Sequence, residues 1–209
     1  MTDEGPSANR PPHILLPFWG PELSLRALIP ILLVAACATG GCDRQNPGAG
    51  QANESLPAAK PVAADKLDRS HKGEAAPALA FTDAAGKKLT VASFAGKPVL
   101  LNLWATWCAP CVKEMPTLDA VAVAKGDALH VVTVSQDLKG AEIVAPFFEK
   151  AKFKKLQPYL DPDIAWSMTL GANLPMTILY DKAGKEIWRV AGDMDWTSPE
   201  ATALIAEAG

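Results

Sequence analysis

The segment VLLNLWATWCAPC, Val99–Cys111, determines how this chain folds. It begins as a continuous apolar run, typical of a buried strand, and it ends in two cysteines separated by two residues. A helix that starts at the first cysteine brings the two sulfur atoms close enough to bond without moving the backbone. The segment therefore predicts a reversible disulfide between Cys108 and Cys111, at a strand end and the first turn of a helix.

The start of a helix makes the two cysteines unequal. Unpaired N–H groups and the positive end of the helix dipole favour the thiolate of Cys108, which is predicted to attack. Cys111 lies one turn further in and is predicted to resolve the mixed disulfide. Pro110 suits the first helical turn, where a missing N–H costs little. Neither Ala109 nor Pro110 adds a positive charge that would stabilise the reduced form, so the pair is predicted to be a reductant.

A zinc site and a pair of inert core cysteines are the competing interpretations of this motif. A structural zinc site needs four ligands, but the sequence has no second C-x-x-C and its only histidines are His13, His71 and His130. We therefore predict no metal and no separate cofactor, because the Cys108–Cys111 disulfide itself carries the electrons. The near balance of 20 Lys and Arg against 23 Asp and Glu argues against nucleic acid as a partner.

Residues 1–42 form a predicted signal and lipobox segment or an N-terminal membrane anchor. The apolar stretch Ala27–Ala38 is too short for a membrane span and has the size of a signal-peptide core. LVAAC, Leu33–Cys37, resembles the lipobox of bacterial lipoproteins, so Cys37 is the predicted lipidation site and Cys42 the weaker candidate. Cleavage with lipidation and an uncleaved anchor both predict a periplasmic or extracytoplasmic protein tethered to the membrane.

Two further regions follow this segment. Residues 43–76 are rich in Ala, Pro, Gly, Asn and Lys without an aromatic residue, which predicts a flexible linker. Residues 77–209 alternate strand and helix signals and predict one α/β domain. The predicted strands are 79–82, 87–91, 99–103, 129–134, 176–180 and 186–190, and the predicted helices start after Cys108 and at 141, 164 and about 198. The last helix is predicted to bury Ala201, Leu204, Ile205 and Ala208.

NLWATWCAPC, Asn102–Cys111, followed by KEMP, Lys113–Pro116, resembles the TlpA/ResA-type thiol:disulfide oxidoreductases. The resemblance extends from Leu79 to the C-terminus. It implies a thioredoxin fold with a central mixed β-sheet flanked by helices and an N-terminal β-hairpin extension. Leu174-Pro175 matches the cis-proline segment of the family, which implies that the Leu174 backbone lies beside Cys108, where a client peptide could pair with it.

The resemblance also assigns roles to side chains near the cysteines. Glu114 matches an acidic residue that could relay a proton to Cys111 or raise a thiol pKa, and the alternative is a solvated carboxylate on the helix surface. Asn102 stands where cytoplasmic thioredoxins keep a buried Asp, and a neutral amide cannot act as a general base. Trp107 is predicted to cover the disulfide and to offer apolar contact area.

Together these features predict an exported thiol:disulfide oxidoreductase that reduces disulfides of client proteins. The resemblance implies clients in cytochrome c or cytochrome oxidase biogenesis and a membrane electron donor of the DsbD/CcdA type. One alternative is an oxidant of the same fold. Another is a Sco-like copper-binding chaperone, although that family uses a wider C-x-x-x-C spacing and a distant His.

Overall fold

The computed structural model describes residues 66–209 of the chain. The predicted signal or anchor segment 1–42, with Cys37 and Cys42, and residues 43–65 of the predicted linker lie outside the described residues. Within residues 66–209 no helix is both long enough and apolar enough to cross a membrane.

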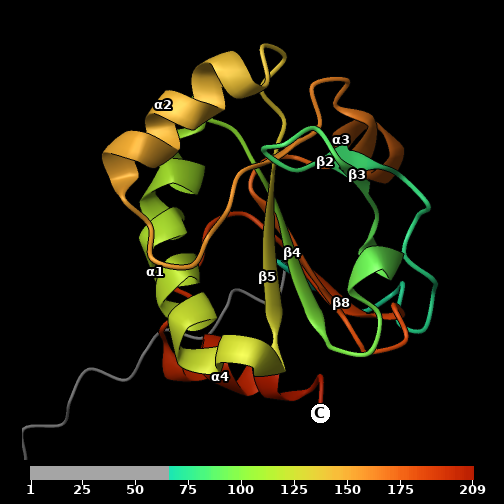
Figure 1. The fold of residues 1–209 in the computed structure, drawn as a ribbon. Helices are drawn as coiled ribbons and strands as arrows, with labels where there is room; N and C mark the ends of the chain where they lie inside the picture. Colours follow the sequence, from blue (N-terminus) through green and yellow to red (C-terminus); the bar gives the residue numbers. More distant parts are fainter. Residues whose placement is uncertain (1–65) are drawn as a thin grey trace, which may run out of the picture. The chain divides into compact units, whose positions relative to one another are not determined.

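A mixed sheet forms the centre of the domain (Figure 1). Its eight strands follow the order β1-β8-β7-β4-β5-β6-β2-β3, and β4 pairs parallel with β5 and antiparallel with β7. The strands are β1 Leu67–Asp68, β2 Phe81–Thr82, β3 Lys88–Leu89, β4 Val99–Trp104, β5 His130–Ser135, β6 Tyr159–Leu160, β7 Met176–Tyr180 and β8 Glu186–Ala191. The predicted α/β fold with a mixed sheet and an N-terminal hairpin, β2–β3, is confirmed.

Helices cover both faces of this sheet. They are α1 Ala109–Lys125, α2 Ala141–Ala151, α3 Ala165–Leu170 and α4 Pro199–Ala206, with short 3-10 helices η1 Val91–Phe94 and η2 Gly126–Ala128. Helices α1, α2 and α4 pack on one face, and α3 and η1 pack on the other.

Strand β4 supplies side chains to both hydrophobic cores because successive residues of a strand point to opposite faces. Leu100 and Trp104 pack under α1, whereas Leu101 and Leu103 pack on the α3 face. All six β4 residues are buried, and the polar Asn102 lies on the same face as Leu100 and Trp104. The strand therefore brings one amide group beneath the start of α1.

Several local predictions are confirmed by the helix ends and faces. Cys111, Met115, Leu118 and Ala122 form the buried face of α1. Ser198 accepts the N–H of Ala201 at 3.1 Å and caps α4. One expectation is wrong: α4 ends at Ala206, so Ala208 lies beyond the helix and is only half-buried.

The sequence did not predict β1 or β6, each of which has only two residues. Residues 66–76 had been assigned to the linker, yet Leu67 and Asp68 pair with Val190 and Arg189 of β8. A two-residue strand has too little length for a periodic pattern, so its pairing depends on a neighbour far away in the sequence.

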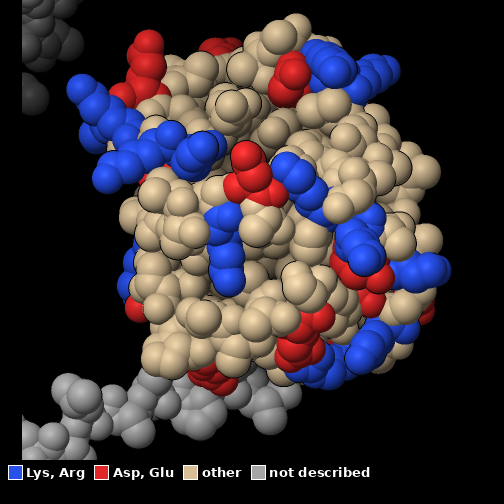
Figure 2. Space-filling view, turned by 60° about the horizontal axis from the view of Figure 1, so that its bottom comes forward, with Lys and Arg blue, Asp and Glu red and all other residues tan. Residues whose placement is uncertain are grey.

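The surface charge of the domain is mixed. On the face shown in Figure 2, basic and acidic side chains are interspersed rather than gathered in a patch of one sign.

Asp119 attaches the segment after α2 to α1. Its carboxylate accepts the backbone N–H groups of Lys154, Lys155 and Leu156 at 3.0, 2.8 and 3.0 Å. Burial raises the pKa of Asp119, but the three N–H donors outweigh burial and leave this pKa below its usual value. One side chain thus replaces the backbone partners that this irregular segment lacks.

We expect Asp119→Ala to lower the free energy of unfolding by roughly 1–3 kcal/mol, because three backbone N–H donors, that of Leu156 buried, lose their acceptor. Urea unfolding followed by tryptophan fluorescence measures the change. Asp127→Ala is the matched control, because Asp127 is exposed in η2. Equal unfolding midpoints for the two variants would show that this contact does not stabilise the fold.

Candidate active site

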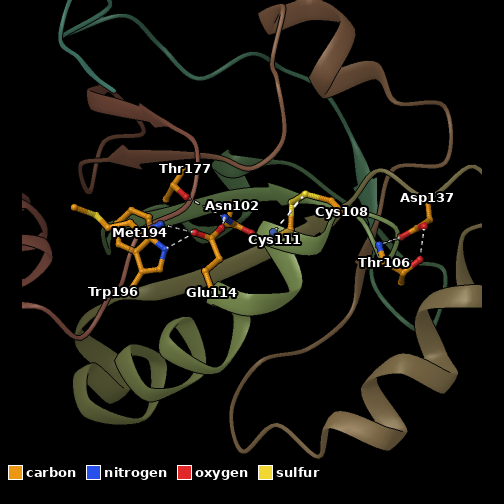
Figure 3. The surroundings of a disulfide bond; sticks show 9 residues. All are labelled: Asn102, Thr106, Cys108, Cys111, Glu114, Asp137, Thr177, Met194 and Trp196. Carbon is orange, nitrogen blue, oxygen red and sulfur yellow. Dashed lines mark hydrogen bonds between the residues drawn. A yellow bond between two sulfur atoms is a disulfide. The ribbon is translucent and has the colours of Figure 1, made fainter. Parts of the chain in front are cut away.

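Cys108 and Cys111 lie where β4 ends and α1 begins (Figure 3). They form a disulfide with a Cα–Cα distance of 5.3 Å. Cys108 is the N-cap residue of α1, and its Sγ accepts the N–H of Cys111 at 3.4 Å. Ala109 and Pro110 form the start of the helix. The Cys108 sulfur therefore lies at the positive end of the helix dipole, where a thiolate is stabilised.

The surroundings of the two cysteines differ. Cys111 is completely buried, whereas Cys108 retains slight exposure and the neighbouring Trp107 is 70% exposed. Trp107 therefore projects from the surface and offers apolar contact area, and its cover over the disulfide stays a prediction. A protein that approaches the site meets Trp107 and Cys108 before it can reach Cys111.

A groove of about 650 Å³ lies beside Trp107. Its wall includes the exposed Met168 of α3 and Leu174, and the peptide bond between Leu174 and Pro175 is cis, as the resemblance implies. Leu174 packs against the core cluster that contains Cys108. The groove is lined by Trp107, Gln136, Ile164, Ser167, Met168, Gly171, Ala172, Asn173 and Leu174. An apolar chain segment can therefore lie beside Trp107, the residue that precedes Cys108.

Glu114 occupies a buried pocket behind Cys111, one turn further along α1. Its Oε1 accepts a hydrogen bond from Asn102 Nδ2 at 2.8 Å. Its Oε2 accepts from Trp196 Nε1 and from the backbone N–H of Met194, both at 3.1 Å. Only 3% of Glu114 is exposed. The alternative of a solvated carboxylate on the helix surface is therefore wrong.

Burial is the main reason why the pKa of Glu114 is raised to about 7. The donors Met194, Asn102 and Trp196 oppose this rise, and the negative charge of Asp193 adds to it. A carboxyl group with this pKa gains and loses a proton near neutrality, as a general acid or base requires.

Asn102 connects Glu114 to the sheet. Its Nδ2 also donates to Thr177 Oγ1 of β7 at 2.9 Å. Among residues 66–209, Asn102 Oδ1 is a buried acceptor with no hydrogen-bond partner. Because an amide carries both donors and an acceptor, Asn102 can face an ionised Glu114 with Nδ2 or, after its amide turns over, a protonated Glu114 with Oδ1.

A second buried carboxylate holds the loop before Trp107. Asp137 accepts hydrogen bonds from Thr106 N, Thr106 Oγ1 and Ser135 Oγ at 2.9, 2.7 and 2.8 Å. Figure 3 shows this group on the Cys108 side and the Asn102–Glu114 pair on the Cys111 side. Asp137 is not among the site residues predicted from the sequence. The available signal was the polar run Ser135–Asp137 at the end of a strand that neighbours β4.

In the described part of the chain, no group of three or more His, Cys, Asp or Glu side chains is placed to hold a metal ion. His130 packs against Phe94, with ring centroids 5.1 Å apart, and burial lowers its pKa. The Cys108–Cys111 disulfide is the group here that supports thiol–disulfide chemistry.

Glu114 should make the stability of the oxidised protein fall as pH rises between about 4.5 and 7. The folded protein binds a proton in this range that the unfolded chain releases, so the free energy of unfolding decreases by about 3 kcal/mol. Glu114→Gln should abolish this slope, because the Gln side chain does not titrate. The Gln oxygen can still accept from Trp196 and Met194, and its NH2 group can donate to Asn102 Oδ1. Denaturant unfolding across this pH range, with the exposed Glu142→Gln as control, measures the effect. Parallel pH profiles for the wild type and Glu114→Gln would contradict it.

Comparison with known proteins agrees with this geometry. Residues 71–205 match the family model named Redoxin. The thiol-disulfide oxidoreductase ResA of Bacillus thuringiensis subsp. konkukian is 34% identical over 129 residues, 61% of this chain and 74% of that protein. ResA of Bacillus subtilis is 30% identical over 125 residues, 59% of this chain and 69% of that protein.

A solved structure extends the comparison to three dimensions. The pneumococcal exposed lipoprotein thioredoxin of Streptococcus pneumoniae superimposes with a TM-score of 0.54 at 26% identity, covering 62% of this chain and 98% of that one. Proteins of this kind use a redox-active disulfide in place of a cofactor, which is the group found here between β4 and α1. Since the family model spans nearly all of the described domain, the chain belongs to the Redoxin family and is a thiol-disulfide oxidoreductase of the TlpA/ResA type.

Proposed function

We propose that this oxidoreductase reduces disulfides of client proteins outside the cytoplasm while tethered to a membrane. The observation that carries the proposal is the position of Cys108, at a helix N-terminus and directly after Trp107, which lines an exposed and mainly apolar groove. The first feature favours the attacking thiolate, and the second provides contact area for a protein. The absence of positive charge in Ala109 and Pro110 favours the reductant over the oxidant.

The reduced pair transfers two electrons to the client in two displacements. Cys108 thiolate attacks one sulfur of the client disulfide, which forms a mixed disulfide and releases the other client sulfur as a thiolate. Cys111 then attacks Cys108 Sγ, which forms the Cys108–Cys111 disulfide and releases the second client thiolate. Glu114 accepts the proton of the Cys111 thiol during this second step.

Burial and pKa support this role for Glu114. Cys111 is fully buried, so its proton needs an acceptor inside the protein. Glu114 has a pKa of about 7, and Figure 3 shows the Asn102 side chain between Glu114 and Cys111. The carboxylate therefore lies one helical turn beyond Cys111, with Asn102 between the two groups, and is basic enough to accept a proton near neutral pH.

The proposed location rests on the sequence outside the described residues. Ala27–Ala38 has the size of a signal-peptide core, and Leu33–Cys37 resembles a lipobox. The pneumococcal relative is itself described as an exposed lipoprotein. Clients in cytochrome c or cytochrome oxidase biogenesis and a DsbD/CcdA-type membrane donor follow from the family resemblance and complete the proposed electron path.

We expect Cys111→Ser to accumulate a mixed disulfide, because the first displacement proceeds and the second is blocked. The reduced variant is mixed with a peptide that contains an intramolecular disulfide, and the adduct is located by mass spectrometry. Cys108→Ser is the matched control and should form at least roughly tenfold less adduct, since buried Cys111 is a poor attacking group. Equal adduct yields would contradict the assigned order of attack.

Lipidation at Cys37 predicts that the protein extracted from membranes begins at a diacylglyceryl-cysteine at position 37. Intact-mass measurement tests this directly. Cys37→Ser should leave the chain unprocessed, whereas Cys42→Ser should be processed normally. A mature chain that still carries residues before Cys37 would rule out lipidation at that site.

A further inference from the structure

A second hollow in the domain is lined in part by Glu114, which lies on the Cys111 side of the disulfide in Figure 3. It has a volume of about 160 Å³ and is lined by Lys113, Glu114, Thr117, Asp193, Met194 and Asp195. No residue is shared between this hollow and the groove beside Trp107. Glu114 lines the hollow and does not line the groove.

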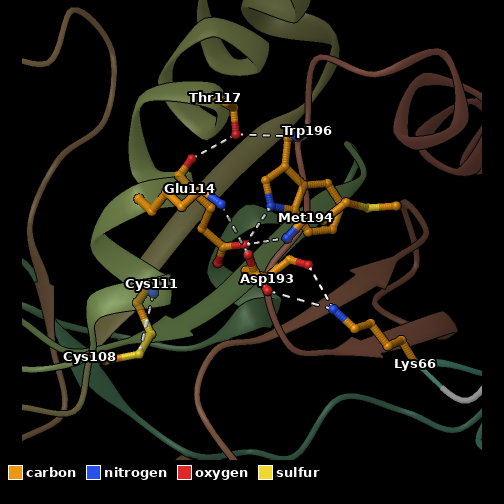
Figure 4. Close-up of polar contacts among 9 residues, drawn as sticks. Lys66, Cys108, Cys111, Glu114, Thr117, Asp193, Met194 and Trp196 are labelled. Carbon is orange, nitrogen blue, oxygen red and sulfur yellow. Dashed lines mark hydrogen bonds and ion pairs between the residues drawn. A yellow bond between two sulfur atoms is a disulfide. The ribbon is translucent and has the colours of Figure 1, made fainter. Parts of the chain in front are cut away.

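Charged side chains lie at the hollow, and Figure 4 shows Lys66 reaching Asp193 near Glu114. Asp193 carboxylate oxygens lie 3.6 Å from Lys66 Nζ and 3.9 Å from Lys113 Nζ. Lys66 Nζ also donates to the backbone oxygen of Asp193 at 3.3 Å. Asp193 precedes Met194, whose N–H donates to Glu114 Oε2. Asp193 is therefore the chain neighbour of the residue whose backbone N–H binds the Glu114 carboxylate.

A client protein would block the other side of the site. During exchange it is joined to Cys108 and lies along the groove beside Trp107, so that surface is closed to solvent. Glu114 accepts a proton in this same interval and must later release it. A path that opens away from the client allows the proton to leave without separation of the complex.

We propose that the hollow lined by Lys113, Glu114, Thr117, Asp193, Met194 and Asp195 is the route by which Glu114 exchanges its proton with solvent while a client covers Cys108. This inference rests on the proposed exchange function. Asp193 is a positioning residue at the rim: its negative charge favours the protonated form of Glu114, and its ion pairs hold the Met194 loop over the carboxyl group.

The charges around Glu114 predict how substitutions act. Asp193 and Asp195 face the hollow as acids, and Lys113 and Lys66 are the bases near it. The other partners of Glu114, which are Asn102, Trp196 and the Met194 backbone, are neutral. Removing the charge of Asp193 should therefore make Glu114 lose its proton at lower pH.

Infrared spectroscopy can follow the carbonyl band of protonated Glu114, which is assigned by its loss in Glu114→Gln. We expect Asp193→Asn to lower the midpoint of this band by roughly 0.5 pH unit, as for a like charge in a hydrated setting. Asp163→Asn is the matched control, because exposed Asp163 neighbours Ile164 of the groove, and it should leave the midpoint unchanged.

The route itself is tested in the Cys111→Ser protein joined through Cys108 to a disulfide-derived peptide. After a pH jump, Glu114 should gain its proton at the same rate, within about twofold, with and without the attached peptide. A protonation rate that falls by more than roughly tenfold in the adduct, or an unchanged midpoint in Asp193→Asn, would overturn the route while leaving the exchange function intact. If no peptide adduct forms at Cys108, the exchange function itself fails and the route fails with it.

Discussion

Burial of β4 on both faces fixes the position of the disulfide. The strand lies in the centre of the sheet, and a shift of one residue would exchange the side chains that pack into the two cores and move Asn102 away from α1. Cys108 caps α1 shortly after β4 ends at Trp104, and Cys111 lies in the first turn of α1, so the buried strand determines where both cysteines stand. The start of α1 then supplies the electrostatic field that makes one sulfur more acidic than the other.

Two buried carboxylates divide the site between the two cysteines. Asp137 holds Thr106 and thereby the loop that carries Trp107 on the Cys108 side. Glu114 lies on the Cys111 side, within a set of donors that comes from β4, α1 and the loop before α4. Electron transfer with the client and proton transfer with solvent can therefore use different surfaces of one small domain.

The sequence contained the parts of the site that depend on local pattern. The C-x-x-C motif, the apolar β4 run and the capped α4 helix each lie within a short segment, and their positions follow from periodicity and helix-end chemistry. The family resemblance predicted the cis bond before Pro175 and a role for Glu114 near the thiols. It did not predict that the Glu114 carboxyl group is buried. Burial depends on Trp196 and Met194, about 80 residues away in the chain, so no local pattern reports it.

The same reason explains the features that were missed. Asp137, Asp193 and Met168 carry no distinctive pattern in the sequence, and only the packing of β5, the β8–α4 loop and α3 brings them to the site.

The equilibrium reduction potential of the Cys108–Cys111 pair in the folded domain tests most directly whether the protein is a reductant. A value below roughly −220 mV is expected of a reductant, whereas a value near about −120 mV, as in strong periplasmic oxidants, would contradict the proposed direction of electron flow.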